Sequence, residues 1–216
     1  LDVLGLSVED LGARSDGLAE RLAPLRERLA QDRAAADSQL LPVLDETLPF
    51  LEGDFEALFR DRTKKRAAVW DMPFPSLCAQ AVEKRLAQMT ALEPAAREPN
   101  AVEALHRLRI AVKRVKYALE LSLEVFGKPA KKAYKLIAEL QELLGLVHDC
   151  DVLAGVLNAS AGSIVTRQAA KMAASLVAED RERHRAAALA LLDDIHGRGV
   201  LEDLQRSLKR YAVAAS

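Results

Sequence analysis

Apolar residues recur every three or four positions along almost the whole of this 216-residue chain. This spacing lines one face of an α-helix, whereas a half-buried strand needs strict alternation of apolar and polar residues. Aromatic residues, which collect in sheets together with β-branched ones, make up only 4% of the chain. We therefore expect an all-α fold. The expected helices cover residues 16–47, 51–68, 76–92, 101–126, 130–158, 164–195 and 200–213.

Glycine, proline and capping residues predict where several of these helices end. Gly127 can end one helix in a left-handed turn, and a proline two residues later can begin the next. Asn100 and Glu103 have the spacing of a capping box at a helix start. Pro24 and Pro42 each remove an amide donor, so we expect a kink or a break in the first long helix.

A short internal repeat predicts two halves. Residues 1–4 (Leu-Asp-Val-Leu) reappear at 150–153 (Cys-Asp-Val-Leu), and two further short matches follow in the same order. The segment 70–76 contains two prolines and is the expected linker. We predict that residues 1–70 are the back half of a first helical repeat, whose front half is missing, and that 71–216 are a complete second repeat.

The cysteines, the hydropathy pattern and the motifs exclude several classes of protein. Cys78 and Cys150 are too few for a disulfide framework or a structural zinc site. No uncharged apolar run approaches the roughly 20 residues that span a bilayer, and no charged-then-apolar leader opens the chain. No phosphate-binding glycine loop, nucleophile elbow or zinc-protease motif occurs. We expect a cytoplasmic protein that is not an enzyme and needs no cofactor.

Two segments of opposite charge lie behind the formal net charge of -1. Residues 1–60 carry thirteen acidic side chains against six arginines, and residues 106–135 carry nine lysines or arginines against two glutamates. Salt screens charges beyond about 10 Å, so these local excesses matter more than the total. A basic block inside a balanced protein predicts an anionic ligand or an acidic partner.

The basic block is densest on the expected helix 101–126. At about 100° per residue, most of its cations share one arc beside an apolar stripe, where they repel each other unless anions neutralise them. Phosphate suits such an array, because guanidinium groups grip two of its oxygens at once. A solvated face paired with carboxylates of a neighbouring helix is the alternative. The predicted ligand-binding residues are His106, Arg109, Lys113, Arg114, Lys116, Tyr117, Lys132, Lys135, Arg181 and Arg185.

These residues belong to a longer pattern that resembles the second repeat of a CHAD domain, the helical domain named for its conserved histidines. The pattern is His106-x-x-Arg109, Lys113-Arg114, Lys116-Tyr117, Glu120 and then Leu140-Gln141-x-x-Leu144-Gly145-x-x-His148-Asp149-x-Asp151-Val152-Leu153. The resemblance implies two four-helix-bundle-like repeats related by an internal pseudo-twofold, around a basic central cavity that binds inorganic polyphosphate. It also implies targeting to polyphosphate granules, and an attached or partner triphosphatase domain in some members.

The resemblance carries over to individual residues, with one departure. His106, Arg109, Lys113, Arg114 and Lys116 match the basic residues of the family motif, and Tyr117 and Glu120 match its tail. A full member has another His-x-x-Arg helix before the segment at residues 1–4. That helix is absent here, which leaves half of the expected cavity unaccounted for.

Other chemistries remain open for the histidines and acids of this pattern. Glu103-x-x-His106 has the spacing of a di-iron ligand pair, but no second pair occurs and the adjacent arginines would repel a metal dication, so no metal is expected. His106 could instead be the phosphoacceptor of a histidine phosphotransfer-type protein. A nucleic-acid-binding helical module is disfavoured by the scarcity of aromatics. His148, Asp149 and Asp151 could be metal ligands or an acid–base pair. Such residues more often cap a helix end or pair with a nearby cation, which Lys113 or Arg114 could supply, so we expect a structural role.

Overall fold

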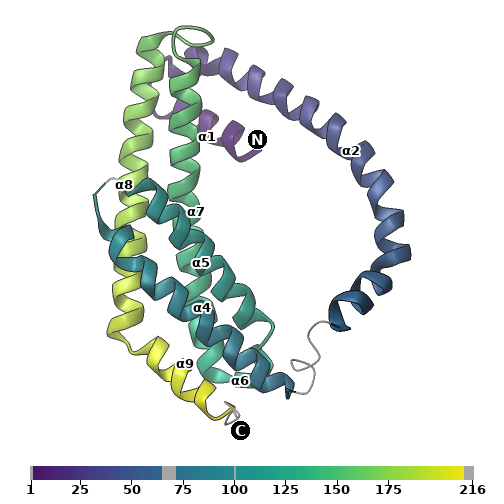
Figure 1. Cartoon of the computed structure of the whole chain (residues 1–216). Helices are drawn as coiled ribbons and strands as arrows, with labels where there is room; N and C mark the ends of the chain where they lie inside the picture. Colours follow the sequence, from purple (N-terminus) through teal and green to yellow (C-terminus); the bar gives the residue numbers. More distant parts are fainter. Residues whose placement is uncertain (1, 65–71, 100, 212–216) are drawn as a thin grey trace. The chain divides into compact units, whose positions relative to one another are not determined.

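The computed structural model describes the backbone of residues 2–64, 72–99 and 101–211, and the side chains of 8–47, 72–99 and 101–211. Within these ranges the chain is helical and contains no strand beyond an isolated bridge between Ala161 and Val165, so the all-α prediction is confirmed (Figure 1). The helices are α1 (Asp2–Ala13), α2 (Leu18–Lys64), α4 (Phe74–Arg97), α5 (Val102–Glu120), α6 (Leu123–Phe126), α7 (Lys128–Ser160), α8 (Arg167–Gly197) and α9 (Val200–Lys209).

The N-terminal helices differ from the prediction. Helix α1 was not expected, and α2 runs without interruption through Pro24 and Pro42, so the predicted separation into 16–47 and 51–68 is wrong. A proline inside a helix removes one hydrogen bond, and a long helix can absorb that loss by bending. Figure 1 shows α2 as a curved ribbon, in agreement with a bend in place of a break.

The expected helix 101–126 is divided into α5 and α6 at a buried serine. The Ser122 hydroxyl donates to the carbonyls of Ala118 at 2.8 Å and Leu119 at 3.1 Å, and the Ser122 backbone leaves the helical region. Such side-chain bonds to the preceding turn compete with the helical ladder. Gly127 then ends the helix with a φ of 61°, a value that favours glycine, but its ψ of -136° lies outside the left-handed helical region that was predicted here.

The start of α5 also departs from the expected capping box. Asn100 lies outside the described residues, and Ala101 occupies the N-cap position without a side-chain hydrogen bond. Glu103 is bound to Arg107 at 3.0 Å, one turn further along the same helix. The glutamate therefore serves an ion pair and not a cap.

The chain forms two compact units. The first comprises Leu1–Asp71 and Val152–Glu179, and the second comprises Met72–Asp151 and Asp180–Ser216. Helices α7 and α8 each contribute to both units. The division predicted from the internal repeat assigns all residues after 70 to one half, whereas the first compact unit includes Val152–Glu179. Compactness does not test a duplication, so the two repeats stay a prediction.

The second unit has a continuous apolar core to which α4, α5, α7, α8 and α9 contribute. Helices α4 and α5 pack along each other, and α7 adds one buried residue every three or four positions. This spacing is that of a single helix face turned towards a core. The buried residues of α7 in this core are Ala130, Ala133, Ile137, Leu140, Leu144 and Val147.

Helix α7 is also the one described helix that is long and apolar enough to cross a membrane by length and composition. The core helix of a soluble protein meets the same criterion, and α7 contributes a regular buried face to the core of the second unit. The finding therefore assigns no location to the protein.

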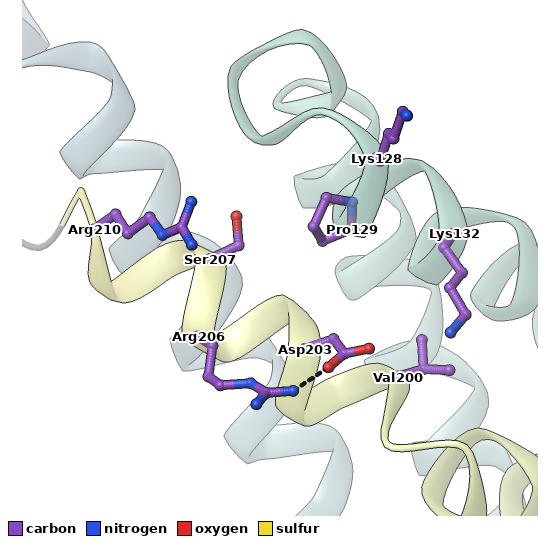
Figure 2. A pocket seen from close by; sticks show the side chains of 8 residues that line it. All are labelled: Lys128, Pro129, Lys132, Val200, Asp203, Arg206, Ser207 and Arg210. Carbon is purple, nitrogen blue, oxygen red and sulfur yellow. Dashed lines mark hydrogen bonds and ion pairs between the residues drawn. The ribbon is translucent and has the colours of Figure 1, made fainter.

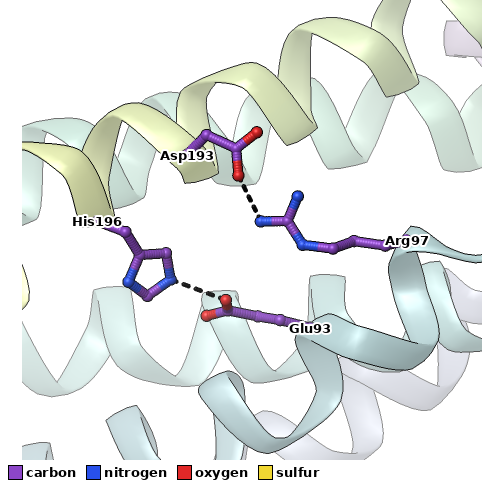
Figure 3. A network of polar contacts seen from close by, with 4 residues as sticks. All are labelled: Glu93, Arg97, Asp193 and His196. Carbon is purple, nitrogen blue, oxygen red and sulfur yellow. Dashed lines mark hydrogen bonds and ion pairs between the residues drawn. The ribbon is translucent and has the colours of Figure 1, made fainter.

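Two polar contacts join α4 to the end of α8 in the second unit (Figure 3). Glu93 is buried, and its Oε2 lies 2.8 Å from His196 Nε2, while Arg97 and Asp193 form a more exposed pair at 2.6 Å. The second carboxylate oxygen of Glu93 is buried without a hydrogen-bond partner. Among the side chains that the structure describes, His196 therefore supplies the direct contact that compensates this buried acid.

The first unit contains a hairpin of α1 and α2. Gly12 lies against α2 so closely that a Cβ atom there would come within 2.8 Å of the Ala19 Cα, and Gly17 turns the chain with a φ of 69°. Beyond Leu29 the described residues of α2, up to 47, are almost all exposed. The buried residues of this hairpin are Val8, Leu11, Leu18, Leu22, Leu25 and Leu29.

Candidate anion-binding surface

The apolar stripe predicted for the basic helix is present on α5. Five residues at helical spacing form it, and all are buried in the core of the second unit with at most 2% of their surface exposed. Because these side chains fix the rotation of α5, the basic residues between them are held at its margin and outer surface. The stripe consists of Leu105, Leu108, Val112, Val115 and Leu119.

The six predicted ligand-binding residues of α5 lie outside this buried stripe and are at least partly accessible to solvent. Lys113, Arg114 and Tyr117 are exposed, and the other three are half-buried. The ammonium groups of Lys113 and Lys116 lie 5.7 Å and 6.0 Å from the centre of the Tyr117 ring, within the range of cation–π attraction. We call this set the α5 basic face; it comprises His106, Arg109, Lys113, Arg114, Lys116 and Tyr117.

The positive charge of the α5 basic face is not neutralised by the described residues. Arg107, which is not a member of the face, pairs with Glu103. No carboxylate of the described residues lies within 4.0 Å of a charged nitrogen of the four Lys or Arg residues of the face. No pairing with carboxylates of a neighbouring helix is therefore found among the described side chains, whereas a solvated face, the other part of that alternative, agrees with the exposure of Lys113 and Arg114.

A second histidine lies beside the α5 basic face. The rings of His106 and His148 have centroids 5.0 Å apart and are tilted by 43°, which places α5 and α7 next to each other here. Asp151, one turn further along α7, pairs with Arg181 at 2.5 Å, so the expected pairing with a nearby cation is present, although that cation is neither Lys113 nor Arg114. Asp151 therefore neutralises a cation of α8 and none of the cations of α5.

The two predicted arginines of α8 have partners within the second unit. Arg181 is mostly buried against Asp151, and Arg185 donates to the backbone carbonyls of Arg97 at 2.8 Å and Glu98 at 3.3 Å. These contacts join α8 to α7 and to the end of α4. Ligand binding by Arg181 and Arg185 stays a prediction, and the function proposed below does not depend on it.

The predicted lysines of α7 are exposed. Neither Lys132 nor Lys135 forms an ion pair with a described residue, whereas Lys131 between them pairs with Glu124 at 2.8 Å. Lys132 lines a pocket between the start of α7 and α9 that sequence reasoning did not find (Figure 2). Two further cations of this pocket are Arg206 on α9 and Arg210 directly after it. The amphipathic pattern of residues 200–209 predicts the helix, but its proximity to the start of α7 is a tertiary contact that local spacing does not predict.

The described residues offer neither a cluster of metal ligands nor a reactive cysteine. No group of three or more His, Cys, Asp or Glu side chains there could hold a metal ion. Both cysteines are free; Cys78 is buried and Cys150 is half-buried. Burial raises the pKa of each thiol, and for Cys150 the carboxylates of Asp180, Asp151 and Asp149 raise it further. Neither thiol is therefore activated as a nucleophile.

The sequence profile of the CHAD domain matches residues 1–158, which include the α5 basic face and His148. The chain belongs to the CHAD domain family. The resemblance inferred from the motif around His106 is thereby confirmed. No curated protein and no solved structure matches the chain. Membership in the CHAD family is consistent with a polyphosphate-binding kind of module.

Proposed function

We propose that this CHAD domain binds inorganic polyphosphate through the α5 basic face and does not change it chemically. The observation that carries the proposal is that four neighbouring cations on α5 have no acidic partner among the described residues. Like charges held on one helix side repel each other, and a polyanion removes that repulsion. Arg109 and Arg114 can each bind two phosphate oxygens, and the lysines add mobile charge.

The histidine pair extends this surface towards α7. A phosphate near His106 or His148 would favour the protonated ring, which adds a cation and a hydrogen-bond donor. Two adjacent rings can then take successive phosphates of a linear chain. The proposed ligand is therefore an extended polymer, in a cytoplasmic setting and on polyphosphate granules where these form, with an attached or partner triphosphatase domain as the family resemblance implies.

The proposal includes the two-repeat architecture with a basic central cavity. Its support is a repeated burial pattern in the first unit. Leu22, Leu25 and Leu29 of α2 are buried, and so are the residues 148 positions later, Ala170, Ala173 and Val177 of α8. Duplicated hairpins would produce this agreement, because equivalent positions then face equivalent partners.

The test is a triple substitution of the α5 basic face, Arg109→Ala, Lys113→Ala and Lys116→Ala. Fewer neutralised phosphates release fewer counterions, so we expect polyphosphate affinity to fall by on the order of ten- to a hundredfold near physiological salt. The slope of log K against log salt should also become less steep by about 2. Binding titrations at two salt concentrations measure both quantities.

A charge-matched control separates the α5 basic face from the overall charge. Arg21, Lys84 and Lys209 are exposed cations on three other helices, and none forms an ion pair with a described residue. Changing these three to Ala removes the same charge and should leave affinity within about twofold of the parent. Equal losses in both triple variants, or parent-like binding by the α5 variant, would refute the assignment.

Two rival functions are tested with the same protein. If His106 were a phosphoacceptor, incubation with a phosphodonor would add one labile phosphoryl group, which intact mass measurement detects; we expect none. If the surface recognised nucleic acid, RNA would displace polyphosphate at fixed salt. We expect polyphosphate to displace RNA, since α5 offers one aromatic residue, Tyr117, for stacking.

A further inference from the structure

The pocket between the start of α7 and α9 lies entirely within the second unit and has a volume of about 460 Å³ (Figure 2). It contains no member of the α5 basic face. Four cations and one carboxylate line it, together with a proline, a valine and a serine. The lining residues are Lys128, Pro129, Lys132, Val200, Asp203, Arg206, Ser207 and Arg210.

The cations of this pocket exceed what its acid can neutralise. Asp203 is paired with Arg206 on the same helix. Lys128, Lys132 and Arg210 form no ion pair with any described residue. The pocket therefore keeps three unbalanced positive charges, which is the condition for binding an anion with several negative charges.

The position of the lysines is unfavourable for α7 itself. A helix start carries the positive end of the macrodipole, where acidic residues stabilise and cations destabilise. α7 nevertheless has no acidic residue in its first turn and begins with Lys128. Because this choice costs helix stability, an anion at the helix start would relieve both the dipole and the repulsion among the lysines.

Helix α9 presents the opposite wall. Its apolar face, which includes Leu204 and Leu208, is buried in the core and holds the helix in place. Figure 2 shows the hydroxyl of Ser207 and the guanidinium of Arg210 on the side of α9 that faces Pro129. A donor hydroxyl in the last turn of α9 and a guanidinium on the residue that follows the helix are groups that bind phosphate oxygens.

We propose that this pocket binds a short phosphate chain, at a site separate from the α5 basic face. Its volume is in the range of small-molecule sites and suits a few linked phosphates. Lys132 and Arg210 contact the phosphates from opposite walls, and Ser207 donates a hydrogen bond. The same chemistry serves a free oligophosphate or the end of a long polymer. The inference does not rest on the function proposed above, because no residue of the α5 basic face lines this pocket.

The probe is tripolyphosphate, titrated into the folded protein by calorimetry. We expect the double variant Lys132→Gln and Arg210→Gln to lose at least tenfold in affinity, with unchanged helicity by circular dichroism. The matched control is Lys84→Gln with Lys209→Gln, which removes the same charge from exposed positions outside the pocket. Parent-like binding by the pocket variant, or an equal loss in the control, would overturn the inference.

The triple variant of the α5 basic face distinguishes failure of this inference from failure of the proposed function. We expect it to retain tripolyphosphate binding while it loses long polyphosphate. Loss of tripolyphosphate binding in the α5 variant, with retention in the pocket variant, would assign the short anion to α5 and refute the pocket. Weaker binding of long polyphosphate by the pocket variant would identify the occupant as a chain end; an effect on tripolyphosphate alone would identify a free oligophosphate.

Discussion

Helices α5 and α8 look alike in sequence and differ in how their cations are used. Both carry several arginines or lysines within a dozen residues. On α8, Arg181 pairs with Asp151, Arg183 with Asp180 and Arg185 with Glu182. On α5, the four cations of the basic face have no such partner among the described residues. These three arginines of α8 are therefore paired within the protein, whereas the four cations of the α5 basic face have no acid of the described residues beside them.

The difference in ion pairing between α8 and α5 follows from the positions of the acidic residues in each helix. On α8, Asp180 and Glu182 lie three residues before Arg183 and Arg185, a spacing that brings their side chains together. On α5 no acid occurs between Glu103 and Glu120. Interleaved acids thus predict a self-neutralised helix, and their absence over four turns predicts an open positive surface.

The largest expected effect is on the buried pair of α7 and α8. The Asp151 and Arg181 side chains are 19% and 16% exposed, so Asp151→Asn would leave a largely buried guanidinium without its counter-charge. We expect the free energy of unfolding to fall by about 2 to 3 kcal/mol, measured by urea denaturation. A decrease in unfolding free energy below about 0.5 kcal/mol would show that the Asp151–Arg181 pair does not stabilise the fold. The proposed difference between α8 and α5 would then be wrong.

A smaller loss is expected at the contact of α4 with α8. His196→Ala would remove the hydrogen-bonding partner of the buried Glu93, at a cost of about 1 to 2 kcal/mol in unfolding free energy. The neighbouring pair of Arg97 and Asp193 is the control, because it is more exposed, and Arg97→Gln should cost less than about 1 kcal/mol. Equal effects at the two pairs would show that burial does not decide their contributions.

On α5 itself, neutralising one cation should hardly change stability. Lys113 has no acidic partner among the described residues, so Lys113→Gln should leave the unfolding free energy within about 0.5 kcal/mol of the parent or raise it slightly through relieved repulsion. The same variant should weaken polyphosphate binding and reduce the salt slope by about 1. A stability loss like that of Asp151→Asn would place Lys113 among the fold's own charges.

The parts of this molecule that depend on local spacing could be predicted from the sequence. The all-helical fold and the buried stripe from Leu105 to Leu119 follow from apolar residues at helical intervals. The continuous α2 could not, because the cost of Pro24 and Pro42 depends on whether the surrounding helix can bend. The partner of Asp151 and the pocket that joins Lys132 to Arg210 depend on tertiary contacts between helices, which local spacing does not encode.

Thiol reactivity offers the finest probe of the same contrast, since a thiolate reports the local charge. Burial raises the pKa of Cys150, the carboxylates of Asp180, Asp151 and Asp149 raise it further, and Arg181 opposes them. Native Cys150 should therefore react with iodoacetamide several-fold more slowly than a free cysteine at pH 8, and its rate should rise only at more alkaline pH.

A cysteine placed on the α5 basic face should behave in the opposite way. In Lys113→Cys the new thiol would stand among Arg109, Arg114 and Lys116, cations that favour the thiolate and lower its pKa. We expect alkylation severalfold faster than for free cysteine at pH 7, with the excess disappearing at about 1 M salt, where screening acts within about 3 Å. Added polyphosphate should slow the reaction, because it neutralises the same cations and covers the thiol. If the two sites reacted at equal rates at low salt, the electrostatic difference between α5 and the α7–α8 pair would not exist in solution.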